Sequence, residues 1–274
     1  MLKRNVDLIV LSDLHLGTFG CHAKELLNYL STVKPKKIIL NGDIIDIWQF
    51  RKKYFPKAHL EVVKTIIEMS MNGTEVIYIT GNHDEMLRKL SYAEVGNLKI
   101  VDKLVLDLDG KKAWFFHGDI FDASIQNAKW LAKLGGWGYD LLILINRFLN
   151  FWLVRFKKEK FSLSKKIKNS VKKAIKHISD FEKTASDLAI EQGYHYVICG
   201  HIHQPQISRK VSKNGTCLYL NSGDWVENLT ALEYHKKRWS LKKYSDLQFK
   251  FENISYKSVN FLTAITVMSN RSKT

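Results

Sequence analysis

A pattern that occurs five times constrains this chain most: a short apolar run of strand type ends directly in a turn rich in Gly, Asp, Asn or His. The clearest example is the run at residues 37–40, which continues into Asn41-Gly42-Asp43-Ile44-Ile45-Asp46. A strand that stops at a glycine and delivers a carboxylate to its carboxyl end is a common way for an α/β sheet to present a site residue. An Asp-rich turn alone is usually only a turn, because Asp and Gly satisfy the backbone there. The other four turns make the stronger case.

The other four turns also carry groups that bind metals. They follow apolar runs at residues 7–11, 76–79, 112–116 and 196–199, and they supply Asp13 and His15, Asn82 and His83, His117, and His201 and His203. Asp13 and His15 share a face of an extended turn and so reach the same ion. A helix cap with an unrelated histidine explains that turn equally well, and a lone histidine at a strand end is usually structural. Five such turns in one chain favour a shared site.

The donor set indicates the kind of metal. Three oxygen ligands and four imidazoles are present: Asp13, Asp43, Asn82, His15, His117, His201 and His203. This mixture suits manganese, iron or zinc and is too rich in nitrogen for calcium or magnesium alone. Seven ligands suit two ions better than one if Asp43 bridges them. We therefore expect two divalent ions, with Mn²⁺ as the first choice and Fe or Zn as alternatives.

The length of 274 residues is enough for one large α/β domain without disulfides. Helical patterns at about 23–32 and 59–71 separate the first strands. One or two edge strands are expected within residues 99–109, and Asp109-Gly110 is a hairpin signal. We expect a catalytic domain at residues 1–244 with a helical insertion at about 122–185. Residues 245–274 form a tail without an interpretable pattern.

The cysteines and the amino terminus bear on the compartment. Cys21, Cys199 and Cys217 are odd in number and lack C-x-x-C spacing, which speaks against a secreted disulfide framework. The chain runs from Met1 directly into a strand-like run too short for a signal-peptide core. We expect a protein of the reducing cytosol that is not exported.

The net charge of +16 indicates a polyanionic partner, either nucleic acid or an anionic membrane surface. Residues 155–176 hold ten basic residues and one acidic residue, so this segment contributes +9. On a helical wheel one arc is apolar: Leu163, Ile167, Val171, Ala174, Ile175 and Ile178. The other arc is basic: Lys165, Lys166, Lys168, Lys172, Lys173 and Lys176.

A basic amphipathic helix beside the aromatic-rich apolar stretch at residues 130–154 is typical of a cap that lies on an anionic bilayer and admits acyl chains. An ordinary surface helix with solvated lysines is the alternative. Asn146, Arg147 and Asn150 interrupt the apolar stretch, and fewer than 18 unbroken apolar residues argue against a spanning helix.

With these motifs in place, the chain resembles the calcineurin-like metallophosphoesterase superfamily, whose motifs are D-x-H, G-D-x-x-D, G-N-H-D/E, H and G-H-x-H. The match extends over residues 6–234. The resemblance implies an α/β fold, a four-layer αββα sandwich, with a dimetal site at the carboxyl ends of the strands. It assigns Asp13, His15, Asp43 and His203 to one ion and Asp43, Asn82, His117 and His201 to the other, so that Asp43 bridges them.

The chemistry expected of such a site is phosphoester hydrolysis. Two cations about 3.5–4 Å apart bind a phosphoryl group, lower the pKa of a bridging water and stabilise the transition state. The leaving oxygen needs a proton, and His83, which is next to Asn82 but is not assigned to a metal, is the candidate general acid. The resemblance implies that Asp46 orients His83.

The insertion and the turn at residues 221–227 look most like the UDP-2,3-diacylglucosamine diphosphatase branch of the superfamily. That branch implies a peripheral enzyme on the cytoplasmic face of the inner membrane, acting in lipid A synthesis on a nucleotide-linked glycolipid to release UMP and the sugar 1-phosphate. The best-known members carry Arg where this chain has His83. Another lipid-linked or nucleotide diphosphate therefore stays open as the substrate.

Two other interpretations remain. A nuclease or nucleotide phosphodiesterase also suits the charge of +16. Against it, the basic residues lie opposite a continuous apolar arc, whereas a groove for nucleic acid more often interleaves them with exposed aromatics. A metal-free binding scaffold is the third interpretation, but such proteins typically lose ligands, and here all seven are present.

Overall fold

The computed structural model describes residues 3–47, 55–121 and 163–247, with the side chains of 163–175 and 177 excepted. The chain divides into two units, Met1–Tyr244 and Ser245–Thr274, and all that follows concerns the first. Of the expected insertion, residues 122–162 lie outside the described residues, as does the tail from residue 248 onwards. None of the helices in the described ranges is long and apolar enough to cross a membrane.

The first sheet has seven strands in the order β12-β11-β1-β2-β3-β5-β4. Their bounds are β1 Arg4–Leu11, β2 Val33–Asn41, β3 Glu75–Ile79, β4 Glu94–Val95, β5 Leu98–Val101, β11 Thr230–His235 and β12 Arg238–Lys243. Strands β1, β2, β3 and β5 are parallel, so their carboxyl ends meet at one edge of the sheet. β2 ends in four consecutive buried residues, as expected for a parallel strand covered on both faces.

The second sheet has five strands in the order β6-β7-β8-β10-β9. Their bounds are β6 Lys103–Leu108, β7 Lys111–Phe116, β8 Tyr196–Cys199, β9 Gln206–Ser212 and β10 Gly215–Asn221. β7, β8 and β10 are parallel. β6 and β7 form the predicted hairpin, with positive φ at Asp109 and Gly110. The region expected to hold one or two edge strands, residues 99–109, holds parts of two strands, β5 and β6, which belong to different sheets. The chain therefore crosses from one sheet to the other at Asp102.

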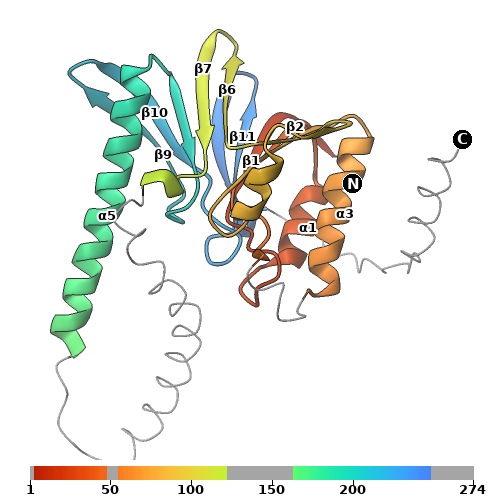
Figure 1. The fold of residues 1–274 in the computed structure, drawn as a ribbon, viewed down its shortest axis with the longest axis horizontal. Helices are drawn as coiled ribbons and strands as arrows, with labels where there is room; N and C mark the ends of the chain where they lie inside the picture. The colour runs from red at the N-terminus through yellow and green to blue at the C-terminus, as the bar shows by residue number, and fades with distance from the viewer. Residues whose placement is uncertain (1–2, 48–54, 122–162, 248–274) are drawn as a thin grey trace, which may run out of the picture. The chain divides into compact units, whose positions relative to one another are not determined.

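The two sheets pack face to face and carry helices on their outer faces, which makes the predicted four-layer αββα sandwich (Figure 1). The core between the sheets includes Val10, Ile39 and Ile77 from the first and Phe115 and Ile198 from the second. The outer helices are α1 Ala23–Ser31 and α3 Lys57–Met71 on the first sheet and α5 Leu163–Glu191 on the second. Short 3₁₀ helices are η1 Glu85–Leu90, η2 Asp119–Phe121 and η4 Tyr244–Asp246.

The helices begin and end close to their predicted positions. α1 ends at Ser31, one residue before the expected end, and α3 begins at Lys57, directly after Pro56. α5 packs on the second sheet through Phe181, Ala185 and Ala189. Of its predicted amphipathic arcs, only Lys176, which is exposed, and Ile178, which is half-buried, have described side chains, but the helical backbone there is confirmed.

Candidate metal centre

All five turns lie at the carboxyl ends of strands, three in the first sheet and two in the second. Asp13 and His15 follow β1, Asp43 follows β2, and Asn82 follows β3. In the second sheet His117 follows β7, and His201 and His203 follow β8. Because the sheets pack against each other, the two sets of turns face one another across the sandwich.

The structure brings six of the seven predicted ligands into two groups of three. Donor atoms of Asp13, His15 and His203 all lie within 4.8 Å of one another, and so do those of Asp43, His117 and His201. Each group draws on both sheets. The division of these residues between two ions stays a prediction.

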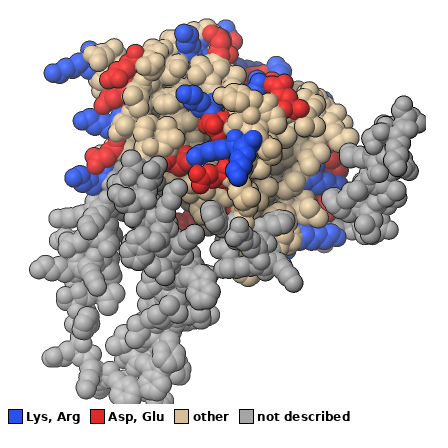
Figure 2. All heavy atoms as spheres, in the orientation of Figure 1, with Lys and Arg blue, Asp and Glu red and all other residues tan. Residues whose placement is uncertain are grey.

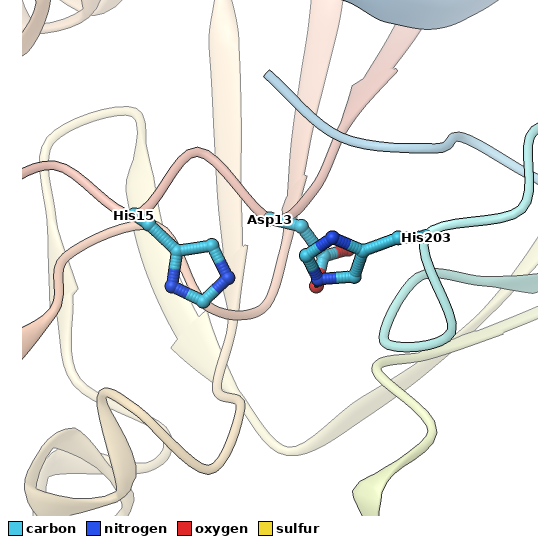
Figure 3. Close-up of side chains that lie close together, drawn as sticks. All are labelled: Asp13, His15 and His203. Atoms are coloured by element: carbon cyan, nitrogen blue, oxygen red, sulfur yellow. The ribbon is translucent and has the colours of Figure 1, made fainter. Parts of the chain in front are cut away.

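The first group is shown in Figure 3, where the rings of His15 and His203 converge beside the Asp13 carboxylate. His203 Nε2 lies 3.2 Å from Asp13 Oδ1, and the ring centroids of His15 and His203 are 5.5 Å apart. Asp13 is fully buried. Burial alone would raise its pKa, but the hydrogen bond to His203 and the neighbouring imidazoles hold the pKa below its ordinary value.

Five of the predicted ligands have backbones in the left-handed region. Their φ values are 53° at Asp13, 49° at His15, 53° at Asp43, 65° at His201 and 51° at His203. Non-glycine residues seldom adopt this conformation, which costs on the order of 1–3 kcal/mol each and persists where the surrounding structure imposes it. The concentration of this backbone strain in one cluster is typical of a functional site.

The turns after β1 and β2 are joined by backbone hydrogen bonds. The Asp13 N–H donates to the Gly42 carbonyl and the His15 N–H to the Asp43 carbonyl, each at 3.0 Å. Gly42 has φ +83°, and a Cβ there would overlap the ring of His117. Glycine is therefore required for the imidazole to approach the Asp43 turn this closely.

Asp43 is the centre of the cluster. Its Oδ1 accepts a hydrogen bond of 2.8 Å from the His83 N–H, and its Oδ2 lies 3.3 Å from His117 Nε2. Burial opposes the charged carboxylate, yet His117, His83 and His15 together hold the pKa of Asp43 far below its ordinary value. A carboxylate so surrounded is ionised and faces the donors of both groups.

Two buried atoms test whether a cation fits. Among the described residues, Asn82 Oδ1 and His117 Nε2 are buried without a hydrogen-bond partner. His117 Nδ1 lies 2.9 Å from the Asn41 carbonyl, which fixes the ring so that Nε2 faces Asp43. A buried polar atom left without a partner costs about 1–3 kcal/mol, and a cation coordinated by both atoms would remove that cost. The residues therefore fit a metal.

The charges around His117 lead to the same conclusion. Burial disfavours the imidazolium, but Asp43 and Asp13 raise the pKa of His117 well above its ordinary value. The pocket thus attracts positive charge. A divalent cation would supply that charge and leave the imidazole neutral as a ligand.

His83 and Asp46 form the predicted pair. His83 Nδ1 lies 3.1 Å from Asp46 Oδ2, and the His83 side chain is 38% exposed. Burial lowers the pKa of His83, but the hydrogen bond to Asp46 and the charge of Asp43 outweigh it, so the pKa is raised. His83 also forms a third group of donor atoms within 4.8 Å with His15 and Asp43. The geometry is thus compatible with a proton donor and also with a ligand.

Buried carboxylates that the sequence analysis did not single out hold the turns in place. Asp84 accepts hydrogen bonds from the N–H groups of Ile44 at 2.9 Å and Gly81 at 2.6 Å, and from the Tyr78 hydroxyl at 2.6 Å. It thereby ties the Asn82 turn to the Asp43 turn. The sequence feature that could have indicated this role is the position of Asp84 at the end of the turn Gly81-Asn82-His83-Asp84.

Asp224 and His59 support the first group. Asp224 is fully buried, accepts the N–H of Val226 at 2.8 Å and lies with Oδ2 3.7 Å from His203 Nδ1. His59, on α3, accepts the Gly17 N–H at 2.9 Å through Nδ1 and so anchors the turn after His15. Asp224 lies in the turn at residues 221–227, but its approach to His203 and the contact of His59 with Gly17 join residues far apart in the chain, which no local sequence pattern signals.

Charge on the described surface is mixed. Figure 2 shows Lys and Arg side chains interspersed with Asp and Glu on the face in view. The strongly basic segment 155–176 contributes little to this picture, since most of it lies outside the described residues.

Comparison with known proteins finds several relatives that carry the same name. A UDP-2,3-diacylglucosamine hydrolase of Aliivibrio fischeri (strain MJ11) is 28% identical over 248 residues, which are 87% of this chain and 98% of the relative. The protein of the same name from Blochmanniella pennsylvanica (strain BPEN) is 24% identical over 239 residues, 85% of this chain and 93% of the relative.

Among solved structures, an archaeal phosphodiesterase matches with a TM-score of 0.41 at 14% identity, covering 86% of this chain and 98% of its own. Yfce, a phosphoesterase from E. coli, matches with a TM-score of 0.46 at 13% identity, covering 87% and 93%. The sequence model of the calcineurin-like phosphoesterases matches residues 7–205. That match spans most of the chain and every predicted ligand, so the protein belongs to the calcineurin-like phosphoesterase family and is a metal-dependent phosphoester hydrolase.

Proposed function

We propose that the protein is a dinuclear-metal phosphohydrolase that cleaves the pyrophosphate of UDP-2,3-diacylglucosamine to UMP and 2,3-diacylglucosamine 1-phosphate, as a step of lipid A synthesis. The observation that carries the reaction type is the pair of donor groups, Asp13, His15 and His203 beside Asp43, His117 and His201. The names of the relatives support the choice of substrate.

We assign Asp13, His15, Asp43 and His203 to one ion, and Asp43, Asn82, His117 and His201 to the other. Mn²⁺ is the expected metal, with Fe or Zn as alternatives. When bound, two such cations polarise a phosphoryl group and lower the pKa of water between them. The buried oxygens of Asp13 and Asp43 supply the negative charge that holds the cations in place.

His83 and Asp46 are proposed to serve the leaving group. In the reaction a water oxygen bonds to phosphorus while the bond from phosphorus to the bridging oxygen breaks, and that oxygen needs a proton. Asp46 faces Nδ1 of His83, which leaves Nε2 to donate the proton. The raised pKa of His83 favours the protonated form that this role requires.

We assign the catalytic domain to residues 1–244, with a cap at about 122–185 and a tail at 245–274. The basic segment 155–176 and the apolar stretch before it are proposed to place the cap on the cytoplasmic face of the inner membrane, where it admits acyl chains.

The function is tested by incubating the manganese-loaded protein with UDP-2,3-diacylglucosamine in mixed micelles and measuring UMP, with Asp43→Ala as the blank. Release of UMP by the wild type alone supports both the site and the substrate. If the protein hydrolyses a simple phosphodiester but releases no UMP, the assignment as a phosphohydrolase stands and this substrate is rejected. The position of His83 is then the first to examine.

The membrane assignment has its own test. Binding to vesicles containing anionic lipid is compared with binding to duplex DNA at matched salt. Preference for vesicles supports the cap on the bilayer, whereas preference for DNA would favour a nuclease, which the net charge of +16 also suits.

A further inference from the structure

Arg88 joins segments that follow two of the proposed ligands. It lies in η1, six residues after Asn82, and its Nη2 donates to Oδ2 of Asp119, which is two residues after His117. Its Nε donates to the Thr80 hydroxyl at 3.3 Å. The guanidinium thus contacts two partners at once. Its planar, forked arrangement of donors suits this, whereas the compact ammonium group of a lysine does not.

These partners lie where the two sheets meet. Thr80 directly follows β3 and precedes the Asn82 turn, and Asp119 begins η2 after β7 of the second sheet. Arg88 Nε also lies 3.8 Å from Asp102 Oδ1, at the point where the chain crosses between the sheets, and the Thr80 hydroxyl donates to that oxygen at 2.7 Å. Arg88 therefore contacts both sheets at the edge that carries the metal centre.

Three other supports of these two ligands run elsewhere, and one of them is the hydrogen bond of 2.9 Å from the Gly200 N–H, after β8, to the His117 carbonyl. The Asn82 turn is tied to the Asp43 turn through Asp84, and the His117 ring is held by the Asn41 carbonyl. These last two supports lead back to the end of β2. The ion pair of Arg88 with Asp119 instead connects the Asn82 segment directly to the His117 segment.

Burial and charge make this pair consequential. The side chains of Arg88 and Asp119 are 33% and 11% exposed, so the pair is only partly screened by water. Loss of Arg88 would leave a largely buried carboxylate unpaired close to a metal ligand.

We propose that Arg88 is a positioning residue that fixes Asn82 relative to His117 and so sets the affinity of the second ion. The proposal rests on the two-ion site proposed above. It concerns binding rather than turnover, so its test does not depend on the identity of the substrate.

The test is a titration of the chelator-treated protein with Mn²⁺, followed by calorimetry and by counting bound ions per chain. We expect two ions on the wild type, and in Arg88→Ala a second ion weakened about tenfold or more, with the first changed less than about twofold. Asn82→Ala provides the reference for loss of the second ion and His15→Ala for loss of the first. Lys99→Ala on β5, which removes the exposed ion pair with Glu94 on β4, is the matched control and should bind as the wild type does.

Two further variants keep the test decisive. Arg88→Lys retains the charge but not the two-point contact, and it should weaken the second ion by less than Arg88→Ala does. The double variant Arg88→Ala with Asp119→Asn should be no weaker than Arg88→Ala alone, because both changes break one link. If Arg88→Ala binds both ions as tightly as the wild type, or if its affinity for both ions falls equally, the proposed role of Arg88 is wrong. Fewer than two ions on the wild type would overturn the two-ion site and this proposal with it.

Discussion

At the scale of single residues, the metal centre combines left-handed backbones at five proposed ligands with carboxylates that are almost fully buried. Neither feature stabilises an isolated domain, because strained backbones and neighbouring buried charges both cost free energy. Their concentration in one cluster indicates that binding, rather than folding, explains this arrangement.

His83→Ala should reduce kcat by about 10²–10⁴-fold, since a general acid contributes that much, while two ions per chain stay bound. Activity against the proposed substrate and metal content measured on the same sample check this. Asp43→Ala, which should lose metal, is the comparison. Loss of an ion from His83→Ala would instead make His83 a ligand in the group with His15 and Asp43.

Asp46→Asn should shift the pH profile of kcat. The hydrogen bond to Asp46 raises the pKa of His83, so removing the carboxylate lowers that pKa and His83 loses its proton at a lower pH. The fall in kcat on the alkaline side should therefore begin at lower pH, with metal content unchanged. A pH profile with the same alkaline limb as the wild type would remove Asp46 from this role.

At the scale of elements, α5 supports the site through Phe181. Its buried ring packs 5.6 Å from the ring of Phe121 and 6.2 Å from that of His201, measured between centroids. Phe181→Ala should lower the free energy of unfolding by about 3–5 kcal/mol, as large-to-small changes of buried aromatics do. Urea denaturation measures it, with Val211→Ala, at a 72% exposed position, as the control. A loss below about 1 kcal/mol would show that α5 does not depend on this contact.

The strand-end turns could be predicted because each is local: an apolar run is followed within a few residues by a ligand, with a glycine close before or after it. The four layers followed from family resemblance rather than from pattern. The edge strands β9 and β12 were not predicted, since Gln206–Ser212 and Arg238–Lys243 are largely polar and lack the apolar run of a covered strand.

The supports of the site could not be predicted for a different reason. His59 contacts Gly17 across 42 positions, and Arg88 contacts Asp119 across 31. Such pairs depend on how the strands are ordered in the two sheets. The split of residues 99–109 between the sheets, which places Asp102 beside Arg88, is equally a property of the tertiary structure.

At the scale of the whole molecule, the two sheets share the metal centre, so bound metal should hold them together. Ions that bind only the folded chain stabilise it by about 2.7 kcal/mol when present at 100 times their Kd. Thermal unfolding should occur at a higher temperature with Mn²⁺ than after chelation, and Asp43→Ala should show little difference. An equal Tm for the wild type in both conditions would contradict metal binding by the native state.

The division of donors between the sheets also bears on biosynthesis. In the proposed assignment each ion has a ligand at His201 or His203, more than 80 residues after the preceding donor, His117. A nascent chain stopped before residue 200 on the ribosome should therefore retain far less Mn²⁺ than the finished protein, which a stalled-chain metal assay would measure. On the proposed assignment, metallation is a late event in the life of each molecule, and truncated translation products should not sequester the metal.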